Sequence, residues 1–367
     1  MLSSMDDYPL HQVAEPIRHA GTSDRNFYDR YYFNLHSCSD ELFMIMGMGQ
    51  YPNLSTQDAF AVVRAGRVHR VVRASRELGD RMDTSVGPFR IEVIEGLKTV
   101  RFVLEPNEHG IEFDLTWTGS MPAHAEPRHH IRQHGRVYFD TMRFAQTGVW
   151  SGELVLGDDR HTVSPDRWWG TRDRSWGIRP VGEPEPAGIR TEGQMRGMWN
   201  YAPMRFEDYS VIYMCQEADD GHRTLEEGVR VWADPDRPPE PLGRPEHAHE
   251  FRPGTRFVEK STLSFPHAPG GKIDIAVTPL VHCYVGVGTG YGLDPDWRHG
   301  MHQGSLVVQG VELDMEDDAE RLDVPWALVD NAARFELDGD VGYGLFEYGF
   351  FGPYRRYGFE SFDDGAS

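Results

Sequence analysis

Apolar and polar residues alternate with a period of two along most of the chain. The pattern is clearest at 89–105 (FRIEVIEGLKTVRFVLE) and 110–119 (GIEFDLTWTG), which the turn sequence PNEHG separates. Successive side chains of a β-strand point to opposite faces, so this pattern predicts strands with one face in solvent. The same pattern recurs at 151–163, 209–217, 256–265, 272–280, 304–315 and 331–352.

Helical periodicity is scarce. Only 56–63 (TQDAFAVV) and 6–17 (DDYPLHQVAEPI) offer short helical candidates. The many strands are punctuated by 39 glycines and 24 prolines, which favour turns between short elements. The sequence therefore predicts an all-β fold, either a barrel or a sandwich.

A faint internal duplication suggests that the chain holds two similar β domains. Three segments of the first half match three of the second in the same order: 32–52 with 199–219, 110–119 with 271–280, and 152–157 with 304–310. The spacing is far too long for a propeller blade or a solenoid repeat. We therefore predict an N-terminal domain at 1–180, a connector rich in proline, glycine and acidic residues at 181–194, and a C-terminal domain at 195–367.

Charge and cysteine usage narrow the possible partners. The 58 acidic and 37 basic residues give a net charge of -21, which would repel a phosphate backbone and an anionic bilayer surface. Nucleic acid and acidic lipid are therefore not expected as partners. Cys38, Cys215 and Cys283 lie far apart in apolar surroundings without a CxxC pair, which favours a reduced, cytoplasmic protein. No membrane span and no targeting segment is predicted.

The segment WWGTRDRSWGIRP (168–180) concentrates aromatic rings and charges. Its tryptophans, Trp168, Trp169 and Trp176, could line an apolar ligand cavity while their N–H groups find partners. Asp173 lies between two arginines and is expected to stay ionised through charge-assisted hydrogen bonds. The alternative is a structural plug, in which the charged residues close the end of a barrel and the tryptophans belong to its core.

The residues DRSWG at 173–177 resemble the D-H-x-W-G signature of the carotenoid 1,2-hydratase (hydroxyneurosporene synthase) and AttH-like proteins. Tocopherol cyclase, kievitone hydratase and fungal decalin-forming Diels–Alderases resemble the same superfamily. Together with GQYPN, VGPFRIEV and FDLTWTG, the stretch RDRSWGIRP is similar to an actinobacterial branch of unnamed function. The resemblance implies an all-β tandem of two lipocalin-like antiparallel β-barrels, which agrees with the duplication. It implies no cofactor.

The chain departs from this signature at Arg174, which stands where the hydratases have a histidine thought to take part in proton transfer. Arginine stays protonated and is a poor general acid or base, although Arg174 or Arg179 could orient an oxygen of a substrate. The resemblance carries Trp176 over to the motif tryptophan, whose π face would stabilise a cationic intermediate. Downstream of the motif the hydratases place a tyrosine and an aspartate in the cavity, and the nearest candidates here are Tyr201 and Asp208.

The segment 198–214 (MWNYAPMRFEDYSVIYM) is rich in aromatic and methionine side chains, such as those of Trp199 and Tyr213, which suit an apolar pocket. A buried carboxylate there would have a raised pKa suited to proton transfer. Asp208 is the candidate for that role, and its alternative is the start of a turn.

Near the C-terminus, Glu347 lies beside Tyr348 in an aromatic stretch. On a strand, this acid would be a proton donor if it faced the interior of a barrel and inert if it faced solvent. Strand alternation decides between the two, and the sequence leaves both open.

Histidines offer further candidates. A cluster that could bind a metal lies at His124, His129, His130 and His134, but the spacing matches no zinc motif and favours an exposed loop, so no metal is predicted. His302 is a candidate substitute base or ligand contact, with a core histidine as its alternative. The run GVGTGYG (286–292) lacks the spacing, the helix and the lysine of a phosphate loop.

Three functions fit these observations. The first is a cofactor-independent hydratase, dehydratase, isomerase or cyclase, which would act on an isoprenoid, polyketide or aromatic molecule in an aromatic-lined cavity at a barrel mouth or between the barrels. The second is a lipocalin-type carrier of an apolar ligand, because Arg174 in place of histidine is what a lost active site would look like. The third is a structural protein with a filled interior. A homodimer is compatible with the sequence.

Overall fold

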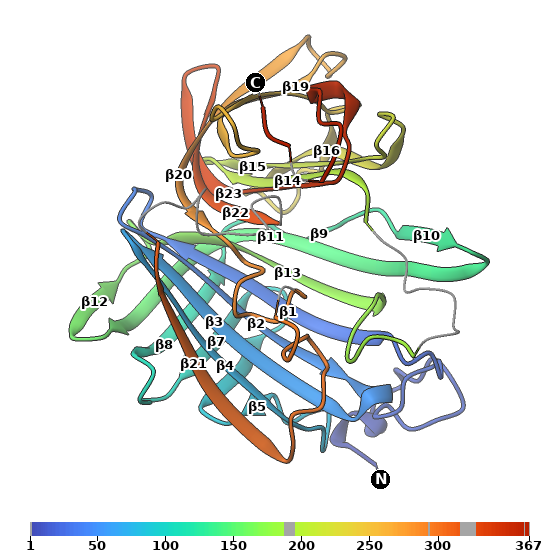
Figure 1. Cartoon of the computed structure of the whole chain (residues 1–367). Helices are drawn as coiled ribbons and strands as arrows, with labels where there is room; N and C mark the ends of the chain where they lie inside the picture. Colours follow the sequence, from blue (N-terminus) through green and yellow to red (C-terminus); the bar gives the residue numbers. More distant parts are fainter. Residues whose placement is uncertain (1, 187–194, 293, 316–327, 363, 367) are drawn as a thin grey trace.

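The computed structural model describes residues 2–186, 195–292, 294–315, 328–362 and 364–366 (Figure 1). Nearly all regular structure in these residues is antiparallel β-sheet. The helical elements described are the short 3-10 helices η1 (Ser4–Asp7), η2 (Pro52–Leu54) and η3 (Arg355–Tyr357). Within these ranges no helix combines the length and the apolar character needed to cross a bilayer.

The first sheet has 14 strands and curls into a nearly closed barrel. Its main path runs β21-β4-β3-β2-β1-β13-β11-β8-β7-β6-β5, and β9, β10 and β12 also pair with β11. Its strands are β1 (Phe27–His36), β2 (Leu42–Tyr51), β3 (Thr56–Ala65), β4 (Val68–Glu77), β5 (Ser85–Val86), β6 (Phe89–Glu95), β7 (Thr99–Leu104), β8 (Ile111–Gly119), β9 (His124–Ala125), β10 (His129–Gln133), β11 (Arg136–Leu156), β12 (Asp159–Val163), β13 (Trp169–Ile178) and β21 (Leu306–Asp314).

The second sheet has nine strands in the order β17-β16-β15-β14-β23-β22-β20-β19-β18 and forms a half-barrel (Figure 1). Its strands are β14 (Gly197–Arg205), β15 (Tyr209–Glu217), β16 (Arg223–Trp232), β17 (Glu240–Pro241), β18 (Glu246–Phe251), β19 (Val258–Phe265), β20 (Ile273–Cys283), β22 (Val329–Leu337) and β23 (Asp340–Phe351). The predicted all-β, two-barrel lipocalin-like fold is confirmed.

The two sheets repeat one strand order, which supports the predicted duplication. The run β4-β3-β2-β1-β13-β11-β8-β7-β6 corresponds strand by strand to β17-β16-β15-β14-β23-β22-β20-β19-β18. Two of the three sequence matches follow this correspondence, because β1–β2 matches β14–β15 and β8 matches β20. The third match is wrong: 304–310 leads into β21, which pairs with β4 at the edge of the first sheet, and the counterpart of β11 is β22.

The proposed connector at 181–194 lies partly outside the described residues, since 187–194 are not described. The strand β21 comes from the segment assigned to the C-terminal domain but belongs to the first sheet. The division at 1–180 and 195–367 therefore stays a prediction.

Three packed cores account for the arrangement of the barrels. One core fills the first barrel, where the rings of Phe33, Trp117 and Trp150 pack edge to face. A second core fills the half-barrel around Phe346 and Tyr348. The third lies between the two sheets and includes Tyr32 and Trp199. Because side chains fill both barrels, space for a ligand must be sought between them.

The helical candidate at 56–63 is wrong, because these residues form β3. Alternate residues of this strand enter two cores: Ala59, Ala61 and Val63 face the first barrel, whereas Phe60 and Val62 face the second sheet. A strand that is buried on both faces loses the alternation that marks a strand in sequence. In 6–17 the only helical turn overlaps η1.

Gly177 is expected to be one of the least replaceable glycines. Its φ is +129°, and a Cβ atom there would lie 2.1 Å from the backbone carbonyl oxygen of Asp140 on β11. Gly177→Ala should cost about 2–4 kcal/mol in urea unfolding. The control Gly66→Ala, at φ +52° with nothing within 4 Å, should cost about 1 kcal/mol. Equal losses would contradict the steric explanation.

Candidate active site

A cavity of about 660 Å³ lies between the two barrels. The first barrel contributes residues of β1, β10, β11 and β13 to its wall, and the second contributes residues of β14, β15, β16, β22 and β23. The loop between β20 and β21 adds residues from 285 to 299. The cavity is therefore a product of the packing of the barrels and belongs to neither barrel alone.

Strand alternation on β13 brings Asp173 and Ser175 to the cavity. Arg172 and Arg174 point to the opposite face, where their guanidinium groups pack on rings of the first barrel. The predicted hydrogen bonds from these flanking arginines to Asp173 are therefore not formed. Burial instead raises the pKa of Asp173 to about 6, although the positive charge of Arg143 opposes the rise.

Glu347 occupies the centre of a three-strand row. On β23 it lies opposite Tyr201 of β14 on one side and opposite Asp330 of β22 on the other. Its neighbours Phe346 and Tyr348 enter the core of the half-barrel, so Glu347 points outward from that barrel. Glu347 thus faces neither the interior of a barrel nor solvent, which were the two alternatives from the sequence. The first barrel covers this outer face of the half-barrel, and Glu347 lines the cavity between the two barrels.

Hydrogen bonds hold the two acids of this row. Trp199 Nε1 donates to Glu347 Oε1 at 2.5 Å, and the Tyr32 hydroxyl donates to Asp330 Oδ2 at 2.5 Å. Burial raises the pKa of Glu347 to about 7, against the opposing effects of Arg143 and of the bond from Trp199. Burial and the nearby Glu347 raise the pKa of Asp330 well above its usual range.

A fourth acid of the cavity, Glu126, forms an ion pair. It is 4% exposed, accepts a hydrogen bond from the Tyr201 hydroxyl at 2.9 Å and forms an ion pair with Arg143 Nε. The Arg143 guanidinium also lies 4.2 Å from the centroid of the Tyr201 ring and 5.4 Å from that of Trp199. These contacts fix the Arg143 guanidinium near Asp173 and Glu347, whose pKa values it opposes in their rise.

The structure brings some of the predicted site residues together. Asp173, Arg179, Trp199 and Glu347 line the cavity, and Tyr201 lies directly behind its wall in contact with Glu126. Sequence reasoning missed Arg30, Tyr32, Glu126, Arg143, Tyr291, His299 and Asp330, which also line the cavity.

The tryptophans of 168–180 are not brought to the cavity. Trp168 belongs to the core of the first barrel, and Trp169 packs under the guanidinium of Arg205 at 3.8 Å. Trp176 is 37% exposed and shares the face of β13 that carries Arg174. Arg174 forms an ion pair with Asp29. One face of β13 therefore packs its arginines on rings of the first barrel, and the other face presents Asp173 to the cavity.

The remaining predicted residues also lie elsewhere. Asp208 is exposed in the turn between β14 and β15, which is the alternative that the sequence offered for it. Tyr213 and Tyr348 face the core of the half-barrel. His302 is exposed, and its Nε2 lies 3.8 Å from a carboxylate oxygen of Glu77. In each case strand alternation or turn position directs the side chain away from the cavity.

The histidine run is not the exposed loop predicted from sequence. His129 is buried on β10 and lines the cavity, whereas His124 on β9 lies 3.0 Å from Glu227. His130 and His134 point elsewhere, since His130 is near Asp140 and His134 has a φ of +51° at the turn before β11. The glycine run 286–292 contributes Tyr291 and its neighbouring glycines to the cavity wall.

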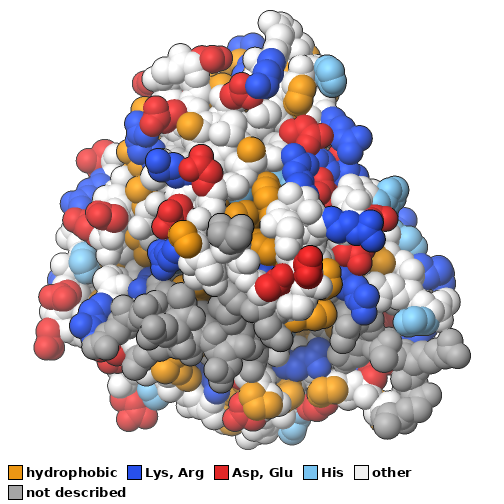
Figure 2. Space-filling model, turned by 45° about the horizontal axis from the view of Figure 1, so that its top comes forward, with side chains coloured by type: hydrophobic (Ala, Val, Ile, Leu, Met, Phe, Trp, Pro, Cys, Tyr) orange, Lys and Arg blue, Asp and Glu red, His pale blue; other side chains and the backbone are white. Residues whose placement is uncertain are grey.

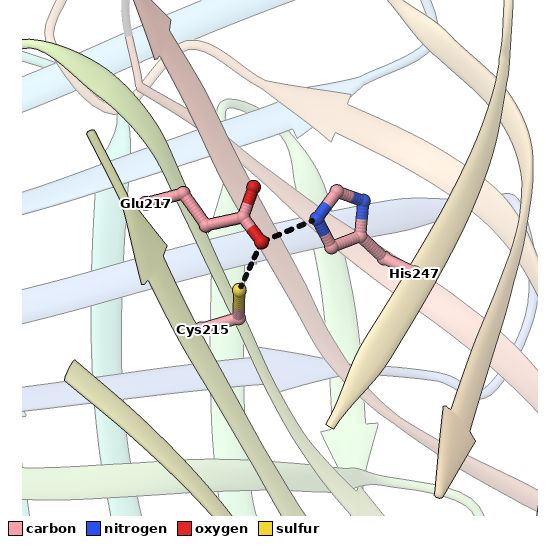
Figure 3. Close-up of side chains that lie close together, drawn as sticks. All are labelled: Cys215, Glu217 and His247. Carbon is pink, nitrogen blue, oxygen red and sulfur yellow. Dashed lines mark hydrogen bonds and ion pairs between the residues drawn. The ribbon is translucent and has the colours of Figure 1, made fainter. Parts of the chain in front are cut away.

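A second polar cluster lies inside the half-barrel. Cys215, Glu217 and His247 bring one potential metal ligand each within 4.8 Å of one another (Figure 3). However, Glu217 already forms an ion pair with Arg223 and accepts a hydrogen bond from Tyr354, and burial raises the pKa of the Cys215 thiol to about 12. These residues therefore fit an internal ion-pair network better than a metal centre.

Glu217 should make stability depend on pH in the acid range. Burial alone would raise its pKa, but hydrogen bonds from His247 and Tyr354 outweigh burial and lower the pKa to about 2. The stabilisation is present above the unfolded pKa and is lost as pH falls through the folded one. Urea unfolding of Glu217→Gln should show a loss of about 1–3 kcal/mol at pH 7 and almost none at pH 2. A loss that is the same at both pH values would contradict this assignment.

Comparison with known proteins places the chain in a family. A family model described as a family of unknown function, DUF8625, matches residues 2–360. The chain belongs to DUF8625. No curated protein matches the sequence. This DUF8625 protein has the fold of three solved structures, each at 12% identity.

The AttH-like protein of Nitrosomonas europaea superposes with a TM-score of 0.57 over 94% of this chain and 98% of its own. Kievitone hydratase from Nectria haematococca has a TM-score of 0.52 over 88% of each chain. The protein CghA, solved with Sch210972, has a TM-score of 0.52 over 89% of each chain. The predicted resemblance to AttH-like double-barrel proteins is thus confirmed at the level of fold.

Proposed function

We propose that this protein is an enzyme that transfers protons to and from an apolar small molecule in the cavity between its barrels. The reaction class is hydration, dehydration, isomerisation or cyclisation. The observation that carries the proposal is that three carboxyl groups with raised pKa, those of Asp173, Asp330 and Glu347, come from both barrels to one cavity. Acids with a pKa near neutrality suit general acid–base catalysis.

The chemistry follows from the protonated and ionised forms of these acids. In a hydration, a protonated carboxyl such as Glu347 gives its proton to one carbon of a double bond, and water adds to the other carbon. The added water then loses a proton, which restores the acid, so no net charge is left. The rings of Trp199 and Tyr32 on the cavity wall would stabilise positive charge that develops on the substrate.

Two fold neighbours support this reaction class. Kievitone hydratase carries a hydratase activity in its name, and CghA was solved with Sch210972. The closer relationship to carotenoid 1,2-hydratase and to an actinobacterial branch stays a prediction, as do the cytoplasmic location, the homodimer and an isoprenoid, polyketide or aromatic substrate.

Solvent-deuterium labelling tests the proposal even when the product has not been identified. The purified protein is incubated in D2O with apolar isoprenoid, polyketide and phenolic alkenes, and mass spectrometry follows deuterium at carbon. We expect at least one compound to gain carbon-bound deuterium with the wild type and to gain little with Glu347→Gln. Native mass spectrometry that shows bound compounds, none of which is altered or labelled, would instead identify a carrier.

A further inference from the structure

Two arginines of the cavity wall, Arg30 and Arg179, form no ion pair with a carboxylate among the described residues. On the outer surface, by contrast, blue and red side chains lie interspersed (Figure 2). Arg30 on β1 is 4% exposed, and its Nε atom has no hydrogen-bond partner in this part of the chain. Its Nη2 lies 3.4 Å from the Tyr291 hydroxyl and 3.4 Å from His299 Nε2. Arg179, just after β13, makes cation–π contacts at 4.8 Å with Tyr28 and at 5.8 Å with Tyr291.

Both guanidinium groups therefore share one ring, that of Tyr291, on the side of the cavity built by the first barrel and the loop 285–299. The neighbouring His299 does not add a negative charge, and burial together with Arg30 and Arg179 holds its pKa well below its usual range. The nearby Asp58 lies outside the cavity wall and accepts hydrogen bonds from Tyr51 at 3.1 Å and from the Gly300 N–H at 2.7 Å.

The acids that line the cavity form no ion pair with these two arginines. Arg143 is neutralised by Glu126. Burial raises the pKa of both Asp330 and Glu347 and so favours their uncharged forms. Arg30 and Arg179 act on two acids, Asp173 on the cavity wall and Asp58 behind it, and oppose the rise of both pKa values. Neither Asp58 nor Asp173 forms a hydrogen bond with either guanidinium, and Arg30 Nε has no partner among the described residues, so an anionic acceptor in the cavity would satisfy donors that the protein leaves open.

We propose that Arg30 and Arg179 form an anion subsite, and that the ligand is an apolar molecule carrying a deprotonated oxygen, as in a carboxylate, enolate or phenolate. The charged oxygen lies between the two guanidinium groups. The apolar remainder extends toward Met214, Leu225 and Phe351 on the second barrel. This inference names the substrate class for the proposed function and rests on the same cavity, while its test measures binding alone.

The test uses two dyes that share a skeleton. 8-Anilinonaphthalene-1-sulfonate carries an anionic group, and N-phenyl-1-naphthylamine has the same rings without it. Fluorescence titration gives the Kd of each for the wild type, for Arg179→Gln and for Arg30→Gln. We expect each substitution to weaken the sulfonate by about 10- to 100-fold, as the loss of a charge-assisted contact does, and to change the neutral dye by less than about threefold.

Arg160→Met on β12, with a side chain that is 68% exposed, is the matched control and should leave both dyes unchanged. Circular dichroism shows whether each variant is folded. If Arg30→Gln does not fold, Arg179→Gln still tests the subsite. Equal weakening of both dyes, or an unchanged sulfonate Kd in Arg179→Gln, would overturn the anion subsite. If the protein labelled neutral alkenes with deuterium but labelled no anionic compound, the anion subsite would also be overturned. The proposed proton-transfer function would then remain intact.

Discussion

Glu347→Gln is expected to lower turnover by about 10²- to 10⁴-fold, which is the usual contribution of a general acid. Glutamine keeps the oxygen that accepts the Trp199 hydrogen bond, so the cavity should keep its shape and its affinity for ligand. The loss should therefore appear in kcat and not in Kd. The measurement is the rate of deuterium incorporation, followed beside a binding titration.

The matched control for this substitution is Glu336→Gln. Glu336 lies on the neighbouring strand β22, but its side chain is 52% exposed and pairs with Arg334 at the surface. Its replacement should leave the rate unchanged. If both variants were equally active, Glu347 would not be the proton donor, and Asp173 would be the next acid to replace.

The pH profile gives a second readout of Glu347. The protonated form is needed, and with a pKa of about 7 the rate should fall about tenfold per pH unit well above neutrality. Stability should also depend on pH, because a carboxyl whose folded pKa is raised destabilises the fold increasingly as pH rises from the unfolded pKa to the folded pKa, and by a constant amount above it. Glu347→Gln should therefore be more stable than the wild type by about 1–3 kcal/mol at pH 9 and nearly equal to it at pH 4.

The fold was largely predictable because alternation records which faces of a strand are buried. Alternation identified the strands β6, β7 and β8, each of which has one face toward solvent. The strand β3 is buried on both faces, and its sequence resembled that of a helix. The edge strand β21 was misplaced for another reason. Its sequence fits an edge position in either sheet, and only tertiary packing adds it to β4.

The site was harder to predict because it lies on the outer faces of two barrels, and sequence periodicity does not show that one barrel will cover the other. One signal was available. Asp338-Gly339 is a hairpin turn that sets the register of β22 and β23, so Asp330 is placed opposite Glu347 by the turn alone. No comparable local signal joins Asp173 to Arg143, because Arg143 lies opposite Ser175 and reaches the acid only through the cavity.

Charge neutralisation by Arg143 should be the largest single stabilising contact of the cavity wall. Arg143→Met would leave Glu126, with a side chain that is 2% exposed, without its cation, and we expect a loss of about 3–5 kcal/mol in urea unfolding. The double variant Arg143→Met with Glu126→Gln should recover part of this loss, since no buried charge remains unpaired. The exposed pair Arg101–Asp114 supplies the control, and Arg101→Met should cost less than about 1 kcal/mol.

The same substitution connects stability to chemistry. Arg143 opposes the rise in the pKa of both Asp173 and Glu347, so its removal should move both values upward. The double variant recovers part of the stability but also removes Glu126, whose charge raises both pKa values by less than Arg143 lowers them. The alkaline limb of its rate profile should therefore still shift to higher pH. A stable double variant with an unshifted limb would show that Arg143 serves only the fold. A shifted limb would show that one cation both holds the barrels together and sets the acidity of the cavity.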